Sequence, residues 1–169
     1  MRRRWAAVGS VVFFFVAPGT VAGFVPWWIT KWQFQPSVLP FAPFHWIGVA
    51  LILAGLVPLV SSFGRFAWQG QGTPAPIAPP TRLVVSGFYR YVRNPMYVSV
   101  VVILTGEAAL FADRRVLVWA AVFWLMTHVF VRVVEEPALA KTFGTDYEAY
   151  RANVPRWIPR VAPWAPPPG

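Results

Sequence analysis

The chain has 169 residues, of which 57% are hydrophobic and only 12% charged, and it contains no cysteine. Soluble domains carry about twice that share of charged residues, so the composition is typical of one membrane-embedded unit, and without cysteine a disulfide framework, a thiolate zinc site and a cysteine nucleophile are excluded. The 15 Lys and Arg against 6 Asp and Glu give a net charge of +9, but the charges lie between long apolar runs rather than on a soluble face, so we expect no nucleic-acid partner.

The first apolar stretch runs from Trp5 to Thr30 without a charge. At about 1.5 Å per residue a helix of this length exceeds the ~30 Å hydrocarbon layer, so the stretch predicts a membrane span. A cleaved signal peptide is the alternative, because Arg2-Arg3-Arg4 precede the run and Val21-Ala22-Gly23 resembles a cleavage site.

The second uncharged stretch, Phe44 to Phe63, is also long enough to cross a membrane, and His45 near its start is a plausible interfacial anchor. The following residues, Gly64 to Pro80, are rich in glycine and proline, which predicts a loop. This loop divides the chain into two halves.

The second half holds two shorter apolar runs, Pro95 to Ala112 and Val116 to Val131, joined by Asp113-Arg114-Arg115. At helical rise they reach only about 24–27 Å, which predicts a helical hairpin that barely crosses the membrane or is partly re-entrant. Glu107 stands alone in its run, and we interpret it as an interfacial or hairpin-packing residue rather than a site residue.

The distribution of Lys and Arg predicts the orientation. With four crossings, one side carries Lys31, Arg114 and Arg115. The other side carries Arg2, Arg3, Arg4, Arg65, Arg82, Arg90, Arg93, Arg132, Lys141, Arg151, Arg156 and Arg160. Positive charge marks the cytoplasmic side, so both termini are expected there.

The expected fold class is therefore an all-α integral membrane protein with about four transmembrane helices, the last two forming the short hairpin. Residues 1–64 form N-terminal helices and residues 65–162 a core, and the low-complexity tail 163–169 is expected to be disordered. The middle loop and the C-terminal segment then meet at the cytoplasmic face, where they would form a pocket.

The segment before the hairpin is the first candidate site. Asn94 is a good N-cap and Pro95 suits the first helical position, so a helix is expected to begin there. A helix N-terminus beside Arg90 and Arg93 is suited to bind a carboxylate or a phosphate. In the alternative interpretation both arginines contact lipid headgroups. The tyrosines of the segment then form an interfacial aromatic belt, consisting of Tyr89, Tyr91 and Tyr97.

The second candidate site lies at the end of the last run. His128, Arg132 and Glu135 are spaced i, i+4, i+7, which places them on one helix face, with Glu136 beside them. An Arg132–Glu135 pair within the helix is the alternative. Because two carboxylates exceed what one arginine neutralises, we expect a cationic ligand. The two histidines, His45 and His128, make no recognisable metal spacing, so no metal is expected.

Two ordered motifs carry a family resemblance. The run Leu83 to Tyr97 resembles the "SGxYRYxRHPxY" segment of the isoprenylcysteine carboxyl methyltransferase and phospholipid methyltransferase-like membrane enzymes. The C-terminal pattern of those enzymes is similar to Glu135-Glu136-x-x-Leu139, Phe143-Gly144-x-x-Tyr147-x-x-Tyr150, Val154-Pro155-Arg156 and Pro159. Together the motifs cover about the second half of the chain, in the order of the family.

The resemblance implies an S-adenosylmethionine-dependent membrane methyltransferase whose cofactor binds at the cytoplasmic boundary. Carried over by position, the contacts are Thr81, Leu83, Val84, Tyr89, Asn94, Pro95, Met96, Tyr97 and Glu135. The common histidine of the family is Asn94 here, and asparagine cannot titrate near neutral pH, so we expect no proton-acceptor role at this position.

The charges agree with such a cofactor, which presents a carboxylate, an ammonium and a sulfonium. The helix start with Arg90 or Arg93 suits the carboxylate, and Glu135 or Glu136 suits the ammonium. Arg132 is a further candidate, as the residue that orients the acceptor. We therefore expect methyl transfer to a lipophilic, membrane-borne acceptor such as a prenyl-linked carboxylate, a phospholipid amine or another small hydrophobic molecule. The alternatives are an NADPH-dependent sterol-type reductase and a non-enzymatic membrane subunit.

Overall fold

The computed structural model describes residues 16–35, 43–69 and 83–165, and all regular secondary structure in these ranges is helical, as predicted. Residues 16–19 are already helical where the first range begins. The elements are η1 (Thr20–Phe24), α2 (Val25–Thr30), α3 (Pro43–Gln69), η2 (Gly87–Arg90), α4 (Pro95–Phe111), α5 (Arg114–Phe130), η3 (Val131–Glu135) and α6 (Glu136–Asn153).

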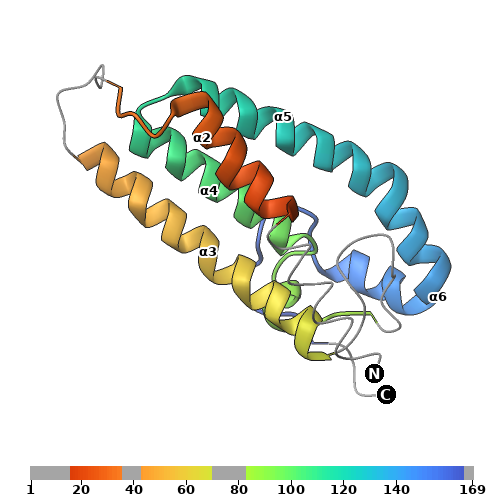
Figure 1. Cartoon of the computed structure of the whole chain (residues 1–169). Helices are drawn as coiled ribbons and strands as arrows, with labels where there is room; N and C mark the ends of the chain where they lie inside the picture. The colour runs from red at the N-terminus through yellow and green to blue at the C-terminus, as the bar shows by residue number, and fades with distance from the viewer. Residues whose placement is uncertain (1–15, 36–42, 70–82, 166–169) are drawn as a thin grey trace.

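The long helices form an elongated bundle in which α3, α4 and α5 lie side by side and α2 crosses over α4 and α5 (Figure 1). Two helical stretches are long and apolar enough to span a membrane, Phe44–Arg65 and Arg114–Asn153. Helix α4 is also apolar but shorter. The outer faces of α3 and α5 expose large apolar side chains such as Leu53, Val57, Val118 and Leu125, as is typical of helices that face lipid.

Helix α3 is longer than the sequence predicted. The loop expected from Gly64 begins later, because the helix continues to Gln69. A single glycine costs a helix only about 1 kcal/mol, whereas the adjacent Ser62 and Phe63 are buried and hold this turn in place. The rest of the predicted loop, up to residue 80, lies outside the described residues.

Glycines allow α3 and α4 to approach closely. A Cβ atom on Gly48 would lie 2.7 Å from the carbonyl oxygen of Gly106, and a Cβ atom on Gly106 would lie 2.8 Å from the carbonyl oxygen of Gly48. About two helical turns further along α3, a Cβ atom on Gly55 would lie 2.8 Å from the carbonyl oxygen of Ser99. Small residues at contacts of this kind let membrane helices pack backbone to backbone, which gains dispersion energy that lipid cannot supply.

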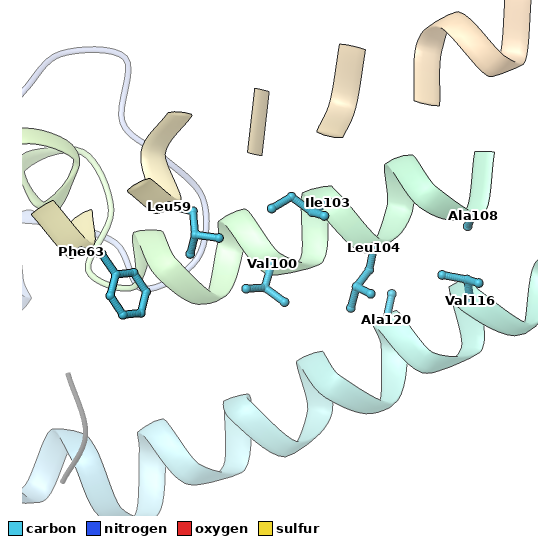
Figure 2. Packing of buried hydrophobic residues seen from close by; sticks show 8 residues of the cluster. All are labelled: Leu59, Phe63, Val100, Ile103, Leu104, Ala108, Val116 and Ala120. Carbon is cyan, nitrogen blue, oxygen red and sulfur yellow. The ribbon is translucent and has the colours of Figure 1, made fainter. Parts of the chain in front are cut away.

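The buried core lies between α3, α4 and α5, as Figure 2 shows. Leu104 and Val116 are fully buried where α4 and α5 meet. The cluster consists of Leu59, Phe63, Val100, Ile103, Leu104, Ala108, Val116 and Ala120.

The first helical stretch belongs to the same bundle. Val21, Ala22 and Ile29 pack against the core, and the Trp119 indole donates a hydrogen bond to the Val21 carbonyl over 2.9 Å. Residues 1–15, which hold the start of the predicted first span and the basic motif of the signal-peptide alternative, lie outside the described residues.

Helices α4 and α5 form the predicted hairpin, with a tighter turn than expected. Ala112 adopts a left-handed conformation that ends α4, and the Asp113 side chain caps α5 by accepting the Arg115 backbone N–H at 2.9 Å. Arg114 and Arg115 are therefore in the first turn of α5 rather than in the connection. At the same end, the His45 ring donates to the Leu110 carbonyl at 2.6 Å, so His45 joins α3 to α4.

The helix that contains the last apolar run does not end near Val131, where the sequence analysis placed its end. The π-helical turn η3 carries α5 directly into α6, and the combined stretch has 40 residues. Gly144 then breaks α6, with φ 52° and ψ −125°, a backbone conformation that side chains bearing a Cβ atom rarely adopt. The helix kinks there, and beyond the kink Tyr147 and Tyr150 lie near the start of α4, at a cavity that Arg93 and Asn94 also line.

Candidate functional site

The residues that precede α4 are held by the C-terminal strap, defined here as residues 154–165. The strap runs beside residues 90–94 and exchanges backbone hydrogen bonds with them. The Arg93 N–H donates to the Pro155 carbonyl, the Arg160 N–H to the Tyr91 carbonyl and the Trp164 N–H to the Arg90 carbonyl, each over 2.9 Å. The two segments that the sequence motifs singled out therefore lie together, as the resemblance predicted.

Arg90 takes part in this structural pairing. Its Nε atom donates to the Trp164 carbonyl oxygen at 2.6 Å. Trp164 also packs against Tyr150, with ring centroids 5.8 Å apart. Trp164 lies within the stretch that the sequence analysis assigned to the low-complexity tail, and residues 166–169 lie outside the described ones.

Helix α4 begins as predicted, with Pro95 at its first position, but the Asn94 side chain does not cap it. Instead, Asn94 Nδ2 donates to the Arg156 carbonyl oxygen of the strap at 3.2 Å. Asn94 is 7% exposed, and its own carbonyl accepts the Val98 N–H. This position therefore connects the helix start to the strap by its amide, a role that requires no titration.

A small cavity of about 20 Å³ lies between the start of α4, the η3 turn and α6. A cavity of that size holds about one water molecule. Charged, polar and apolar side chains from three separate parts of the chain line the cavity. The lining residues are Arg93, Asn94, Val131, Glu135, Glu136, Leu139, Tyr147 and Tyr150.

Glu136 is bound by two arginines. Its carboxylate lies 2.9 Å from Arg93 Nη1, and Arg156 donates to both of its oxygens, at 2.6 and 2.8 Å. This pairing raises the pKa of Arg156 above its ordinary value. Glu136 and Arg93 are both nearly buried. The sequence analysis set one arginine, Arg132, against the two carboxylates, whereas in the structure Arg93 and Arg156 neutralise Glu136.

Glu135, in contrast, has a neutral partner. Its Oε2 atom accepts a hydrogen bond of 3.2 Å from the Tyr97 hydroxyl group, and no cation of the described residues pairs with it. Glu135 lies at the end of the π-helical turn η3, and Tyr97 lies in the first turn of α4. One carboxylate beside the cavity is thus left without a counter-ion from the described part of the chain.

Three tyrosines, Tyr89, Tyr147 and Tyr150, complete the surroundings. Tyr147 accepts a hydrogen bond of 3.2 Å from Arg93, whose Nε atom is buried without an acceptor among the described residues. Tyr89 lies close enough to be affected by the acid: burial, and secondarily the Glu135 carboxylate, raise the pKa of the Tyr89 phenol well above its ordinary value. The Tyr150 hydroxyl donates to the Tyr89 carbonyl at 2.7 Å, which ties this loop to α6.

The predicted stripe of His128, Arg132 and Glu135 is not retained. The π-helical turn between them changes the angular spacing of the side chains, so that Arg132 is exposed and does not line the cavity. His128 faces the strap and accepts a hydrogen bond of 3.0 Å from the Trp157 indole. The alternative Arg132–Glu135 ion pair is also absent from the described ion pairs.

Of the other residues that the resemblance assigned to the cofactor, Leu83, Val84 and Met96 are not among the residues that line the cavity. Val84 is buried, and Leu83 packs with Tyr147 and Tyr150 rather than lining the cavity. Met96 packs against the bundle core. Thr81 lies outside the described residues. No cluster of three potential metal ligands occurs in the described ranges.

Several lining residues carried no assigned role in the sequence analysis. Tyr147 and Tyr150 are part of the C-terminal motif, and their i, i+3 spacing on a helix places them on one face, which is a usable signal. Val131 and Leu139 look like ordinary apolar helix residues. Nothing in their sequence distinguishes them, because their place at the cavity depends on the π-helical turn.

Comparison with known proteins adds to this geometry. The family model described as "Phospholipid methyltransferase" matches residues 43–146, which run from the start of α3 into α6. The protein-S-isoprenylcysteine O-methyltransferase of Schizosaccharomyces pombe is 35% identical over 80 residues. That alignment covers 47% of this chain and 34% of the relative, so the chain spans about a third of the relative's length. No solved structure matches.

The matched region includes α3, the α4–α5 hairpin and both acidic residues of the site. The motif resemblance of the sequence is thus confirmed by an independent comparison that extends over most of the described bundle. On these grounds the chain belongs to the phospholipid methyltransferase family.

Proposed function

We propose that this protein transfers a methyl group from S-adenosylmethionine to a lipophilic acceptor held in the membrane. Family membership and the named relative support methyl transfer as the reaction. The single observation that carries the assignment of the site is the position of Glu135. It is a carboxylate beside a cavity at the start of α4, and its described hydrogen-bond donor is neutral Tyr97.

The polar groups fit the amino-acid end of the cofactor. Glu135 suits the ammonium group, since a charged hydrogen bond to an ammonium is stronger than the one it accepts from a phenol. The first N–H groups of α4, after Pro95, have no acceptor within the helix and favour an anion such as the cofactor carboxylate. Glu136 is omitted from this role, because Arg93 and Arg156 already neutralise it.

The cavity limits how the cofactor binds. A binding site for a molecule of this size encloses several hundred Å3, against about 20 Å³ here. The described residues thus account for one polar end of the ligand. Binding of the cofactor therefore requires that side chains around the cavity move apart. Leu139 and Tyr150 can move without breaking an ion pair, because neither is charged.

The bound cofactor supplies an activated methyl group on its sulfonium, so no protein nucleophile is needed. The chain contributes position. Glu135 and the start of α4 orient the donor, and the nearly buried Arg93–Glu136 pair holds α6 against the segment that precedes α4. Holding donor and acceptor in line is a large source of acceleration for a displacement of this kind.

The finer membrane arrangement is part of the proposal. We propose four crossings, with both chain ends, and with them the cofactor site, on the cytoplasmic side. The division of Lys and Arg between the two sides, twelve against three of the 15, supports this orientation. A reporter fused after Gly169 should then be active in the cytoplasm, and activity only on the opposite side would overturn the count of crossings.

The test of the function is calorimetric titration of the detergent-purified protein with S-adenosylmethionine, S-adenosylhomocysteine and NADPH. We expect the first two to bind at micromolar affinity, about 8 kcal/mol, and NADPH not to bind. Binding of NADPH alone would favour the reductase alternative. Binding of none of the three would overturn the proposal. Labelled cofactor added with a lipid extract then identifies the acceptor.

A further inference from the structure

The C-terminal strap presents apolar side chains on its outer face. Ile158 is 78% exposed and Val161 is fully exposed, whereas Trp157 and Trp164, on the inner side, are half-buried. A proline, Pro159, separates Ile158 from Arg160, and it too is exposed. One side of the strap thus binds residues 90–94, and the other side exposes aliphatic side chains.

The position of Trp157 fixes the level of the strap along the bundle. Its ring stacks on His128 at a centroid distance of 5.8 Å and lies 6.3 Å from Trp124. Both partners belong to α5, within the apolar stretch that is long enough to span a membrane. Leu125 and Val129, adjacent to them in the helix, are 57% and 51% exposed. The strap therefore returns from α6 to the level of lipid-facing residues.

Charge near this level favours a membrane surface as the partner. Arg132 is exposed one turn beyond His128 and is not among the residues that line the cavity. Arg160 lies between the two exposed aliphatic residues, and its side chain reaches only the Asn153 carbonyl, which leaves its charge unneutralised among the described residues. Cations beside exposed apolar groups are typical of segments that bind anionic lipid surfaces.

We propose that the C-terminal strap is an interfacial membrane anchor. In this arrangement Ile158 and Val161 enter the boundary between headgroups and acyl chains, the Trp124–His128–Trp157 cluster lies at that boundary, and Arg132 and Arg160 contact anionic headgroups. The strap thereby holds residues 90–94 and the cavity at the membrane surface. This inference rests on the geometry of the strap and is independent of which reaction the site performs.

The absence of cysteine from the chain makes the test direct. Single cysteines are introduced as Ile158→Cys, Val161→Cys and, as a control, Ala152→Cys, which is an exposed position on α6 just before the strap. Each is labelled with the environment-sensitive dye NBD. The full-length protein is placed in nanodiscs of phosphatidylcholine and phosphatidylglycerol, with and without lipids that carry a nitroxide near the top of the acyl chain.

We expect blue-shifted emission and loss of more than about half of the fluorescence to the lipid nitroxide at positions 158 and 161, since interfacial segments lie about 5–10 Å deep. The control at 152 should show water-like emission and little quenching. Equal quenching at all three positions by an aqueous quencher, with no lipid effect at 158 and 161, would overturn the anchor. Val161 is fully exposed, so its replacement disturbs no packing. Cofactor titration of the same labelled proteins reports the proposed function separately.

Discussion

The Tyr97 hydroxyl group donates a hydrogen bond to Glu135 Oε2 over 3.2 Å, across 38 residues of sequence. One residue lies in the first turn of α4 and the other closes the π-helical turn after α5. Two short motifs that are each weak alone therefore meet at one point. The contact places a carboxylate beside the cavity between the α4 start and α6, and the first prediction concerns this carboxylate.

Replacement of Glu135 by Gln should weaken binding of S-adenosylmethionine and S-adenosylhomocysteine by about tenfold or more, because a charged hydrogen bond contributes roughly 1.5–3 kcal/mol. The thermal midpoint should not fall, since the substitution keeps the shape and removes a charge that lacks a described cation partner. Calorimetry and a melting curve in the same detergent measure the two effects. Glu148→Gln, which makes the same charge change at an exposed pair, is the matched control. Unchanged affinity in the Glu135 variant would remove this residue from the site.

Replacement of Glu136 by Gln should act on stability first. The change leaves Arg93 and Arg156 facing each other without their shared carboxylate, and uncompensated charge in a nearly buried site costs about 3 kcal/mol or more. Thermal unfolding should show a clear loss. In the control, Arg151→Gln, the lost ion pair is exposed, and the cost should stay below about 1 kcal/mol. If both variants melted alike, the buried pair would not be what holds α6 against the start of α4.

Replacement of Gly48 by Ala should loosen the bundle. The added methyl group would meet backbone atoms of α4 at 2.6 to 2.9 Å, and backbone cannot rotate aside as a side chain can. Overpacking of this kind costs about 1–3 kcal/mol. Gly64→Ala, in the same helix, meets nothing within 4 Å and should be neutral or stabilising by up to about 1 kcal/mol. Melting curves of the two proteins compare the effects, and a Gly48 variant as stable as the Gly64 variant would contradict the close α3–α4 contact.

The ion pair between Asp113 and Arg115, at the connection between α4 and α5, should make a pH-dependent contribution to the stability of the folded protein. The hydrogen bonds and charge of Arg115 hold the pKa of Asp113 below its ordinary value, despite burial of the side chain. A lowered pKa in the folded state means that the ion pair stabilises above the ordinary value of about 4 and that this contribution is lost as the pH falls through the folded value. The stability difference between the natural protein and Asp113→Asn should therefore be constant from neutral to mildly acidic pH and shrink in strong acid.

The cap itself is tested by a second variant. Asn is a good N-cap, so Asp113→Asn keeps the hydrogen bond to the α5 backbone, whereas Asp113→Ala removes it at a cost of about 1 kcal/mol. The two variants should differ by that amount at neutral pH. Equal stability of both would show that α5 does not depend on this cap.

The sequence was sufficient for the features that rest on local rules. The apolar run from Pro95 predicted α4 within a residue of its observed end at Phe111, because proline at the first position and a polar turn after the run mark both ends. The second apolar run predicted the start of α3 equally well. Its end was missed, because contacts of Ser62 and Phe63 with the rest of the bundle outweigh the preference of Gly64 for a loop.

The site was predictable only in part, for a physical reason. Motif order and charge pointed to Tyr97 and Glu135 as members of one site, and the structure brings them together. The loss of Arg132 from the predicted stripe has its origin in the π-helical turn, which no residue between Val131 and Glu135 announces. Likewise, the hydrogen bond from Arg90 to the Trp164 carbonyl was not predicted, since a pairing across 74 residues leaves no periodic pattern in the sequence.

The strap has a bearing on biosynthesis. Residues 154–164 emerge from the ribosome after every helix of the bundle, yet they supply the Pro155, Arg156 and Trp164 groups that fasten the segment before α4. The membrane helices can thus insert and pack while the cavity wall is still unfinished. A chain that ended at Asn153 would keep the described helices and lack the groups that fasten the segment before α4, so this wall of the cavity depends on residues that are made after those helices.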